Sequence, residues 1–353
     1  MKTKTKTTLL LALLLALVCT AASAQEYYTL PEIREQAAAG WHETYTDKYG
    51  RETTVDIDVQ VFGEDKAPVL KVGLPDYVEY THLENNPYLS VTNVKSKGGQ
   101  RTYIYDWYGK EIDLDTAYGA DYGNNLTLRD AYSFIGGKLI EQGISPDGFI
   151  LDQPRTFQML CNTSQKTGEV LSPAFYHLSF WPKLHELPLL THVMRGFVKP
   201  GWPDYSAEMS FMMSNENSYT IAVFTLVEQE MIEEDIPLCS IKKIIESAER
   251  EIEEGHIQKV SSLRFGYTIY NDPTIQSKEP VSVYDAKCFY AVPSWVLECK
   301  YVEKGKETYD ENTSTMYITI NAQTGKMIDP LDKSKFKYAD GDYKGVISWD
   351  KVQ

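Results

Sequence analysis

Two short motifs in this chain carry the residue types of serine acyl-transfer chemistry. Ser240-Ile241-Lys242-Lys243 matches S-x-x-K, and Lys166-Thr167-Gly168 matches K-T-G. In β-lactam-reactive serine enzymes K-T-G follows S-x-x-K, whereas here it comes about seventy residues earlier. A second S-x-x-K at 334–337, in a polar tail, shows how easily the pattern arises. We therefore interpret the motifs as a helix cap and a hairpin turn, and we predict no catalytic residue.

Histidine and acidic residues also lack the spacing of a metal site. His185-Glu186 and His192 suggest a zinc helix, but H-E-x-x-H places its histidines four apart, and Pro188 lies between these two. The glycine and terminal glutamate of an EF-hand are missing around three loop aspartates, Asp113, Asp115 and Asp121. We expect no metal and no cofactor.

Aromatic residues are the remaining candidates for a binding surface. The chain has 25 tyrosines and six tryptophans, which suit sugar stacking or protein contacts, although tyrosine also fits half-buried strand positions. Our candidate partner surface consists of four aromatic residues between 176 and 205: Tyr176, Trp181, Trp202 and Tyr205.

The N-terminal residues 1–24 have the order of a signal peptide. A basic start is followed by an apolar run from Leu9 to Val18 and by Ala22-Ser23-Ala24, so we expect cleavage before Gln25 and a secreted or extracytoplasmic protein. The run is too short to span a bilayer. The alternative is a membrane-anchored lipoprotein, with Cys19 as the lipidation site.

Charge excludes two classes of partner. Cleavage of residues 1–24 reduces Lys+Arg from 35 to 32 against 50 Asp+Glu, so the net charge moves from −15 to −18. A field of this sign repels nucleic acid and anionic lipid, and we expect no nucleic-acid partner and no direct membrane insertion of the mature chain.

Four cysteines remain after cleavage, and the sequence does not choose among their pairings. None has C-x-x-C spacing, and a chain of this length can bury free thiols in its core. Cys288 and Cys299 are the pair that faces across the expected corner at V-P-S-W; the other two are Cys161 and Cys239.

Alternation and capping patterns outline the secondary structure. Hairpins are expected at 41–61 and 101–112, and helices begin at the caps Thr127 and Ser240. After the second helix, strict alternation predicts a strand at 263–269, followed by strands at 288–292, 294–302 and 316–323.

The C-terminal third resembles a known module. The order of an amphipathic helix, L-R-F-G-Y-T-I-Y, A-V-P-S-W and Y-I-T-I-N-A-Q-T-G-K-M-I-D is similar to extracytoplasmic modules of the YycH/YycI type and, more distantly, the PepSY type. The markers of those families stand here as Val292, Pro293, Trp295, Asn321, Ala322, Gly325 and Asp329. The whole layout is similar to exported proteins and lipoproteins of Gram-positive gut bacteria. In the YycI type the N-terminal apolar segment continues as a spanning helix, so the resemblance does not extend to regulating a kinase through the membrane.

These patterns predict an α+β fold with a β-rich N-terminal region followed by two helix-plus-antiparallel-sheet modules, the last YycI/PepSY-like. The expected divisions are a signal peptide at 1–24, the β-rich region at 25–115, modules at 116–235 and 236–330, and a polar tail at 331–353. We expect a non-catalytic extracytoplasmic binding or regulatory protein that acts on an envelope protein through a free sheet face or an exposed edge. The alternatives are a cell-wall or glycan hydrolase with carboxylates in an inter-module cleft, and a carbohydrate-binding module with a cell-wall glycan as partner.

Overall fold

The computed structural model has an α+β fold, as predicted, with a β-rich N-terminal region. The structure describes residues 26–63, 65–73, 89–92, 100–106, 112–151, 156–190, 208–224, 226–271, 289–302, 306–310, 315–327 and 347–352. The expected signal peptide, with Cys19, lies outside these residues.

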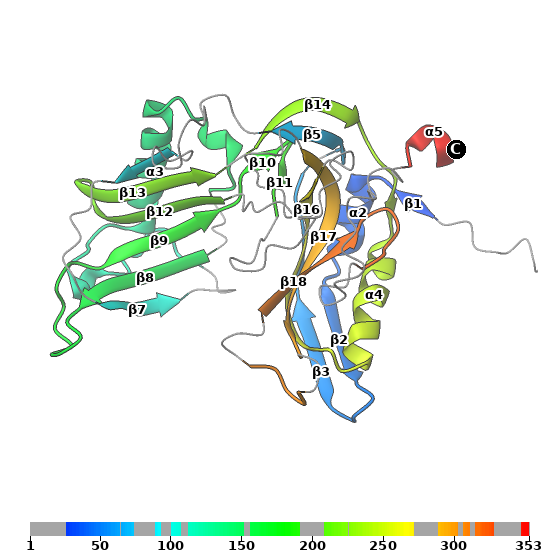
Figure 1. Ribbon diagram of the computed structural model, residues 1–353, viewed down its shortest axis with the longest axis horizontal. Helices are drawn as coiled ribbons and strands as arrows, with labels where there is room; N and C mark the ends of the chain where they lie inside the picture. The colour runs from blue at the N-terminus through cyan, green and yellow to red at the C-terminus, as the bar shows by residue number, and fades with distance from the viewer. Residues whose placement is uncertain are drawn as a thin grey trace, which may run out of the picture.

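One six-stranded antiparallel sheet and one long helix form what we call the central module (Figure 1). The strand order is β6-β13-β12-β9-β8-β7. The elements are β6 Leu89–Thr92, β7 Gln100–Asp106, η2 Ala120–Tyr122, α3 Leu128–Glu141, η3 Pro146–Gly148, β8 Thr156–Thr163, β9 Phe175–Phe180, β12 Glu208–Asn215 and β13 Ser218–Phe224.

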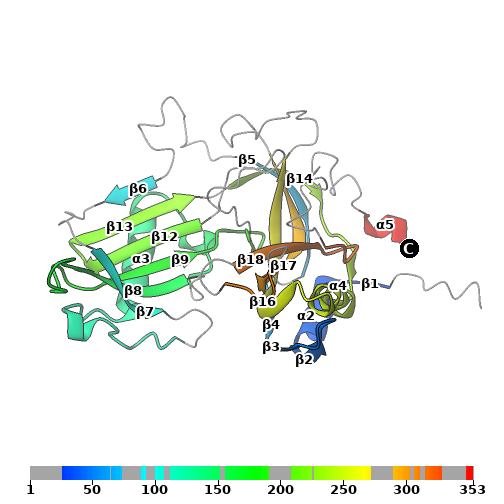
Figure 2. The same cartoon turned by 60° about the horizontal axis from the view of Figure 1, so that its bottom comes forward.

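Both flanking parts of the chain build the second unit, the terminal module. Its sheet has the order β14-β5-β17-β16-β4, with β18 also paired to β17, and only the β4–β16 pair is parallel. Its elements are β1 Tyr27–Tyr28, α2 Leu30–Ala37, β2 Trp41–Thr46, β3 Glu52–Ile57, β4 Val59–Val61, β5 Val69–Gly73, β14 Val227–Glu233, β15 Leu238–Cys239, α4 Ile241–Glu253, β16 Ile257–Asn271, β17 Phe289–Tyr301, β18 Thr315–Asn321 and α5 Trp349–Val352. Figure 2 shows the two modules side by side.

Local signals set the starts and ends of the long helices, as predicted. Thr127 and Asp130 form a reciprocal capping box before α3, and the Ser240 hydroxyl accepts a hydrogen bond from the Lys243 amide before α4. Gly143 and Gly255 follow the two helices with φ of +73° and +76°, which glycine adopts without steric cost. Capping therefore accounts for where α3 and α4 begin and end.

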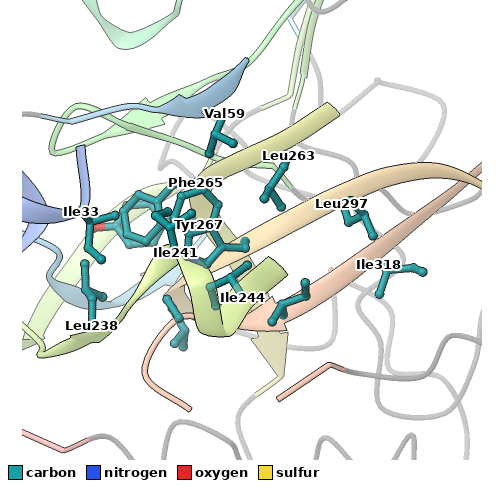
Figure 3. Packing of buried hydrophobic residues seen from close by; sticks show 14 of the residues in the cluster. Ile33, Val59, Leu238, Ile241, Ile244, Leu263, Phe265, Tyr267, Leu297 and Ile318 are labelled. Carbon is teal, nitrogen blue, oxygen red and sulfur yellow. The ribbon is translucent and has the colours of Figure 1, made fainter. Parts of the chain in front are cut away.

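The main core lies between the terminal sheet and its helices. The apolar stripe of α4 is buried against residues that alternate along β16 and β17, including Leu263, Phe265 and Leu297 (Figure 3). Trp295 is fully buried and packs on Phe265. Trp295 is thus a core residue.

The module divisions differ from the predicted ones. Strand β5 pairs with both β14 and β17, and β4 pairs with β16, so the described residues within 26–73 belong to the same unit as those within 226–327. The later N-terminal strand β7 instead pairs with β8 of the central sheet. Alternation predicts that a segment is a strand, but long-range pairing decides its partner, which explains the difference.

The predicted corner at Pro293 is absent, because β17 is one strand from Phe289 to Tyr301. Its pairing with β16 continues on both sides of the proline, with Tyr267 opposite Pro293. The hairpin expected at 41–61 is present as β2 and β3, with Gly50 in its turn. The end of the hairpin expected at 101–112 lies partly outside the described residues.

Candidate functional site

The predicted aromatic surface is not exposed at the two positions that the structure describes. Tyr176 is 0% exposed and donates its hydroxyl hydrogen to the Leu126 carbonyl, and Trp181 is 4% exposed. Strand β9 is central in its sheet and Tyr176 faces the core under α3, so its ring is used for packing. Trp202 and Tyr205 lie outside the described residues.

The two acyl-transfer motifs have the structural roles expected of a cap and a turn. Ser240 caps α4, whereas Lys166-Thr167-Gly168 forms the turn between β8 and the segment before β9, in the other module. Gly168 has a φ of +71°, which this turn requires. The motifs are therefore not brought together.

His185 and Glu186 lie in a tight turn. They connect β10 (Lys183–Leu184) to β11 (Leu187–Pro188) with φ of +47° and +64°, and the His185 ring bonds to Glu228 on β14. His192 lies outside the described residues. Among the residues that are described, no group of three histidines, cysteines or carboxylates could hold a metal ion.

The three candidate cysteines that the structure describes are free and buried: Cys161, Cys239 and Cys299. Burial raises the pKa of the Cys239 thiol to about 11 and that of Cys299 well above its usual range. Strand β17 has no corner at V-P-S-W, and Cys288 lies outside the described residues.

The sequence did not indicate a buried charge cluster on the terminal sheet. Glu298 on β17 lies 3.1 Å from the Arg264 guanidinium on β16, and the same carboxylate accepts hydrogen bonds from Ser262 and Tyr317. The strand register explains the contacts, since Ser262 and Tyr317 are the direct cross-strand partners of Glu298. Glu298 is only 2% exposed. The sequence signal was a carboxylate within the apolar run of β17.

Burial sets the acidity of this carboxylate. Loss of solvent raises the pKa of Glu298 to about 7, while the hydrogen bond from Tyr317 and the charge of Lys300 act in the opposite direction. Arg264 is also held by Gln60 on β4, whose side-chain oxygen accepts from Nε at 2.9 Å. The cluster therefore ties together β4, β16, β17 and β18.

The central module covers this cluster. The Trp181 ring lies 5.0 Å from the Arg264 guanidinium carbon, and Trp181 and Leu190 pack on Val296 of β17. Next to Arg264, a Cβ on Gly266 would lie 2.7 Å from the Pro188 carbonyl oxygen, so only glycine permits this close approach. We call these contacts the module joint. The sequence left the sheet face opposite the helices free for a partner or a second module, and here Trp181 and Leu190 of the chain itself pack on it.

Strand β14 is the exposed element of the terminal sheet. It stands at one end of the strand order, next to β5 (Figure 1). Six of its seven residues are exposed. Three large apolar side chains on it are exposed: Val227 at 36%, Met231 at 40% and Ile232 at 40%. An edge strand offers backbone groups to an added strand.

The turn that carries the N-A-Q-T-G-K marker is built by side-chain hydrogen bonds. The Asn321 side-chain oxygen accepts from the amides of Gln323 and Thr324, both at 2.9 Å, and Ala322 is fully buried. Gly325 has a φ of +66° and closes the turn against α4. These marker residues therefore have structural reasons for their types.

No family model matches this chain, and no curated protein matches it. A solved structure of an uncharacterized protein from Eubacterium rectale ATCC 33656 is similar, with 9% sequence identity and a TM-score of 0.49, over 84% of this chain and 98% of that chain. In the described part of the chain, no helix is both long enough and apolar enough to cross a membrane.

Proposed function

We propose that this chain is a non-catalytic extracytoplasmic protein that binds or regulates an envelope protein, and that β14 is its contact strand. The observation that carries this proposal is the exposure of Val227, Met231 and Ile232 on an edge strand. Extended segments bind such edges through backbone hydrogen bonds, while exposed side chains select the partner. The signal-like residues 1–24 and the resemblance to YycH/YycI-type modules support the location outside the cytoplasm.

The charge of β14 selects the kind of segment. The strand contains Glu228, Glu230 and Glu233 and no cationic residue. Glu228 bonds to His185, and Glu230 lies 3.9 Å from Lys71, so the carboxylates are only partly neutralised. We infer that the partner offers an extended segment with lysine or arginine. Two copies of β14 would repel each other, which argues against self-pairing.

The alternatives have less support. Glu298 has the raised pKa of a general acid, but it is 2% exposed and paired with Arg264, so it is not placed to reach a glycan. A carbohydrate-binding face would need exposed rings, and Tyr176 and Trp181 are buried.

Site-specific photo-crosslinking tests the proposal. A photoreactive phenylalanine at Met231 should crosslink to a lysine- or arginine-containing segment of one protein in an envelope extract, identified by mass spectrometry. The same probe at Ile140 on α3, which is 66% exposed, is the matched control.

Added positive charge then tests the strand itself. For this test the photoreactive phenylalanine is placed at position 227. The double variant Met231→Lys, Ile232→Lys should abolish its crosslink to the partner, whereas Ile140→Lys should not. Equal capture from positions 231 and 140, or retention on cell-wall glycan without a protein crosslink, would contradict the proposal.

A further inference from the structure

A groove lies between α4 and the turn after β18, outside β14 and the module joint. Its volume is about 440 Å³, within the range of small-molecule sites. The lining residues are Ser240, Lys242, Lys243, Glu246, Ser247, Arg250, Thr324, Gly325 and Lys326. The groove is therefore shaped by the same helix start and marker turn that define the C-terminal module.

Close packing holds the two walls of the groove together. The Ser247 hydroxyl on α4 lies 2.5 Å from the Gly325 carbonyl oxygen and donates to it. A Cβ on Gly325 would lie 2.9 Å from the Lys243 Cγ, so glycine lets the turn approach the lysine stem. The position of the cationic groups is thus set by a packed helix and a tight turn.

The groove is positively charged, whereas the chain as a whole is negatively charged. Four cationic side chains, Lys242, Lys243, Arg250 and Lys326, face one carboxylate, Glu246, in a chain with a net charge of −15. Lys242 lies 3.9 Å from Glu246. Within the described part of the chain, the other three cations have no ion-pair partner. This leaves a local excess of positive charge.

Side chains, and not helix amides, would supply the binding groups. The Lys243 amide donates to Ser240 Oγ at 3.3 Å, and the Ile241 amide donates to the Gln36 side chain at 3.1 Å. Lysine ammonium groups act as point charges, and the Arg250 fork matches the oxygens of a phosphate. Several cations around one space favour a ligand with two or more negative charges on neighbouring atoms.

We propose that the α4–β18 groove binds a small phosphorylated ligand through Lys243, Arg250 and Lys326. The groove is separate from β14. A test of the groove therefore does not depend on whether β14 binds a protein partner. A free phosphomonoester and a phosphate within a polymer offer the same chemistry. Glycerol 3-phosphate and synthetic poly(glycerol phosphate) distinguish these two sources.

Titration calorimetry of the purified mature chain with glycerol 3-phosphate, poly(glycerol phosphate) and inorganic tripolyphosphate tests the site. Some or all of the phosphate probes should bind the wild type. For each of these, the double variant Lys243→Gln, Arg250→Gln should have an affinity lower by about tenfold or more, which is a loss of about 1.4 kcal/mol in binding free energy. Lys166→Gln with Lys138→Gln, in the central module, removes the same charge and should leave binding unchanged. Equal weakening by both pairs, or no binding of any phosphate probe at low salt, would overturn the proposal.

Citrate tests the ligand class, since it carries similar charge on carboxylates. Citrate binding as tight as that of tripolyphosphate would overturn the assignment to phosphate.

Lysine acetylation gives a readout on the unmutated chain. Tripolyphosphate should slow acetylation of Lys243 and Lys326 but not of Lys166, as measured by peptide mass spectrometry, and uniform rates would contradict the site.

Discussion

The Glu298 carboxylate and the Arg264 guanidinium, 3.1 Å apart, form a buried ion pair on the sheet face that the central module covers. Such a pair gains attraction but loses the hydration of both groups. Its stabilising effect therefore depends on the protonation state of Glu298.

Glu298→Gln should change the pH dependence of stability. Because burial raises the pKa of Glu298 from 4.5 to about 7, the folded state holds this proton more tightly than the unfolded state. The contribution of Glu298 to the free energy of unfolding is fully present below about pH 4.5 and is lost as the pH rises through about 7. The difference in unfolding free energy between wild type and Glu298→Gln should shift by up to about 3 kcal/mol between pH 5 and pH 8, measured by urea titration. A pH profile for Glu298→Gln that runs parallel to that of the wild type would contradict the prediction.

Gly266→Ala should loosen the module joint. The new methyl group would meet the Pro188 carbonyl oxygen at 2.7 Å. Gly266 is held in the β16–β17 ladder, and Leu189, next to Pro188, bridges to Tyr267 of β16. We expect a loss of about 1–3 kcal/mol in thermal or urea unfolding, typical of overpacking. Gly136→Ala in α3 has no atom within 4 Å and should instead stabilise by about 0.5–1 kcal/mol. Equal effects of the two changes would show that Gly266 is not tightly packed.

Gly325→Ala should cost more stability than Gly168→Ala. Both glycines have positive φ, at +66° and +71°, so each alanine pays about 1–2 kcal/mol of backbone strain. A Cβ added at Gly325 would lie 2.9 Å from the Lys243 Cγ, whereas a Cβ added at Gly168 would have no neighbouring atom within 4 Å. Differential scanning calorimetry should therefore rank Gly325→Ala as the more destabilising change, and the opposite order would contradict this account of the marker turn.

Ser240→Ala should lower the stability of the chain. The hydroxyl caps α4 by accepting from the Lys243 amide, and loss of such a cap costs about 1 kcal/mol. A fluorescent penicillin should label neither the wild type nor the variant. Covalent labelling of Ser240 would restore the acyl-transfer interpretation.

Local chemistry in the sequence predicted much of the fold. The caps Thr127 and Ser240, the stripe of α4 and the alternation of β16 depend on neighbours within a few residues, and all were confirmed. The pairing of β5 between β14 and β17 depends on segments more than a hundred residues apart, which no local pattern contains.

The candidate sites were predicted less well, for the same reason. Whether Trp181 is exposed depends on Arg264 in the other module, on which its ring lies. The α4–β18 groove forms only when Lys326 is brought beside the cations of α4, such as Arg250. By contrast, the exposed edge anticipated from the strand-rich pattern is present in β14, although the sequence did not single out that strand.

The pairing of Gly73 with Val227 has a consequence for this architecture. These residues face each other in the β5–β14 ladder, so the chain leaves the terminal sheet and returns to it at adjacent points. In topological terms the whole central module replaces the loop of a β-hairpin. A short turn in its place should still allow β5 and β14 to pair, although the bridge between Leu189 and Tyr267 of β16 and the packing of Leu187 in the terminal core would be lost.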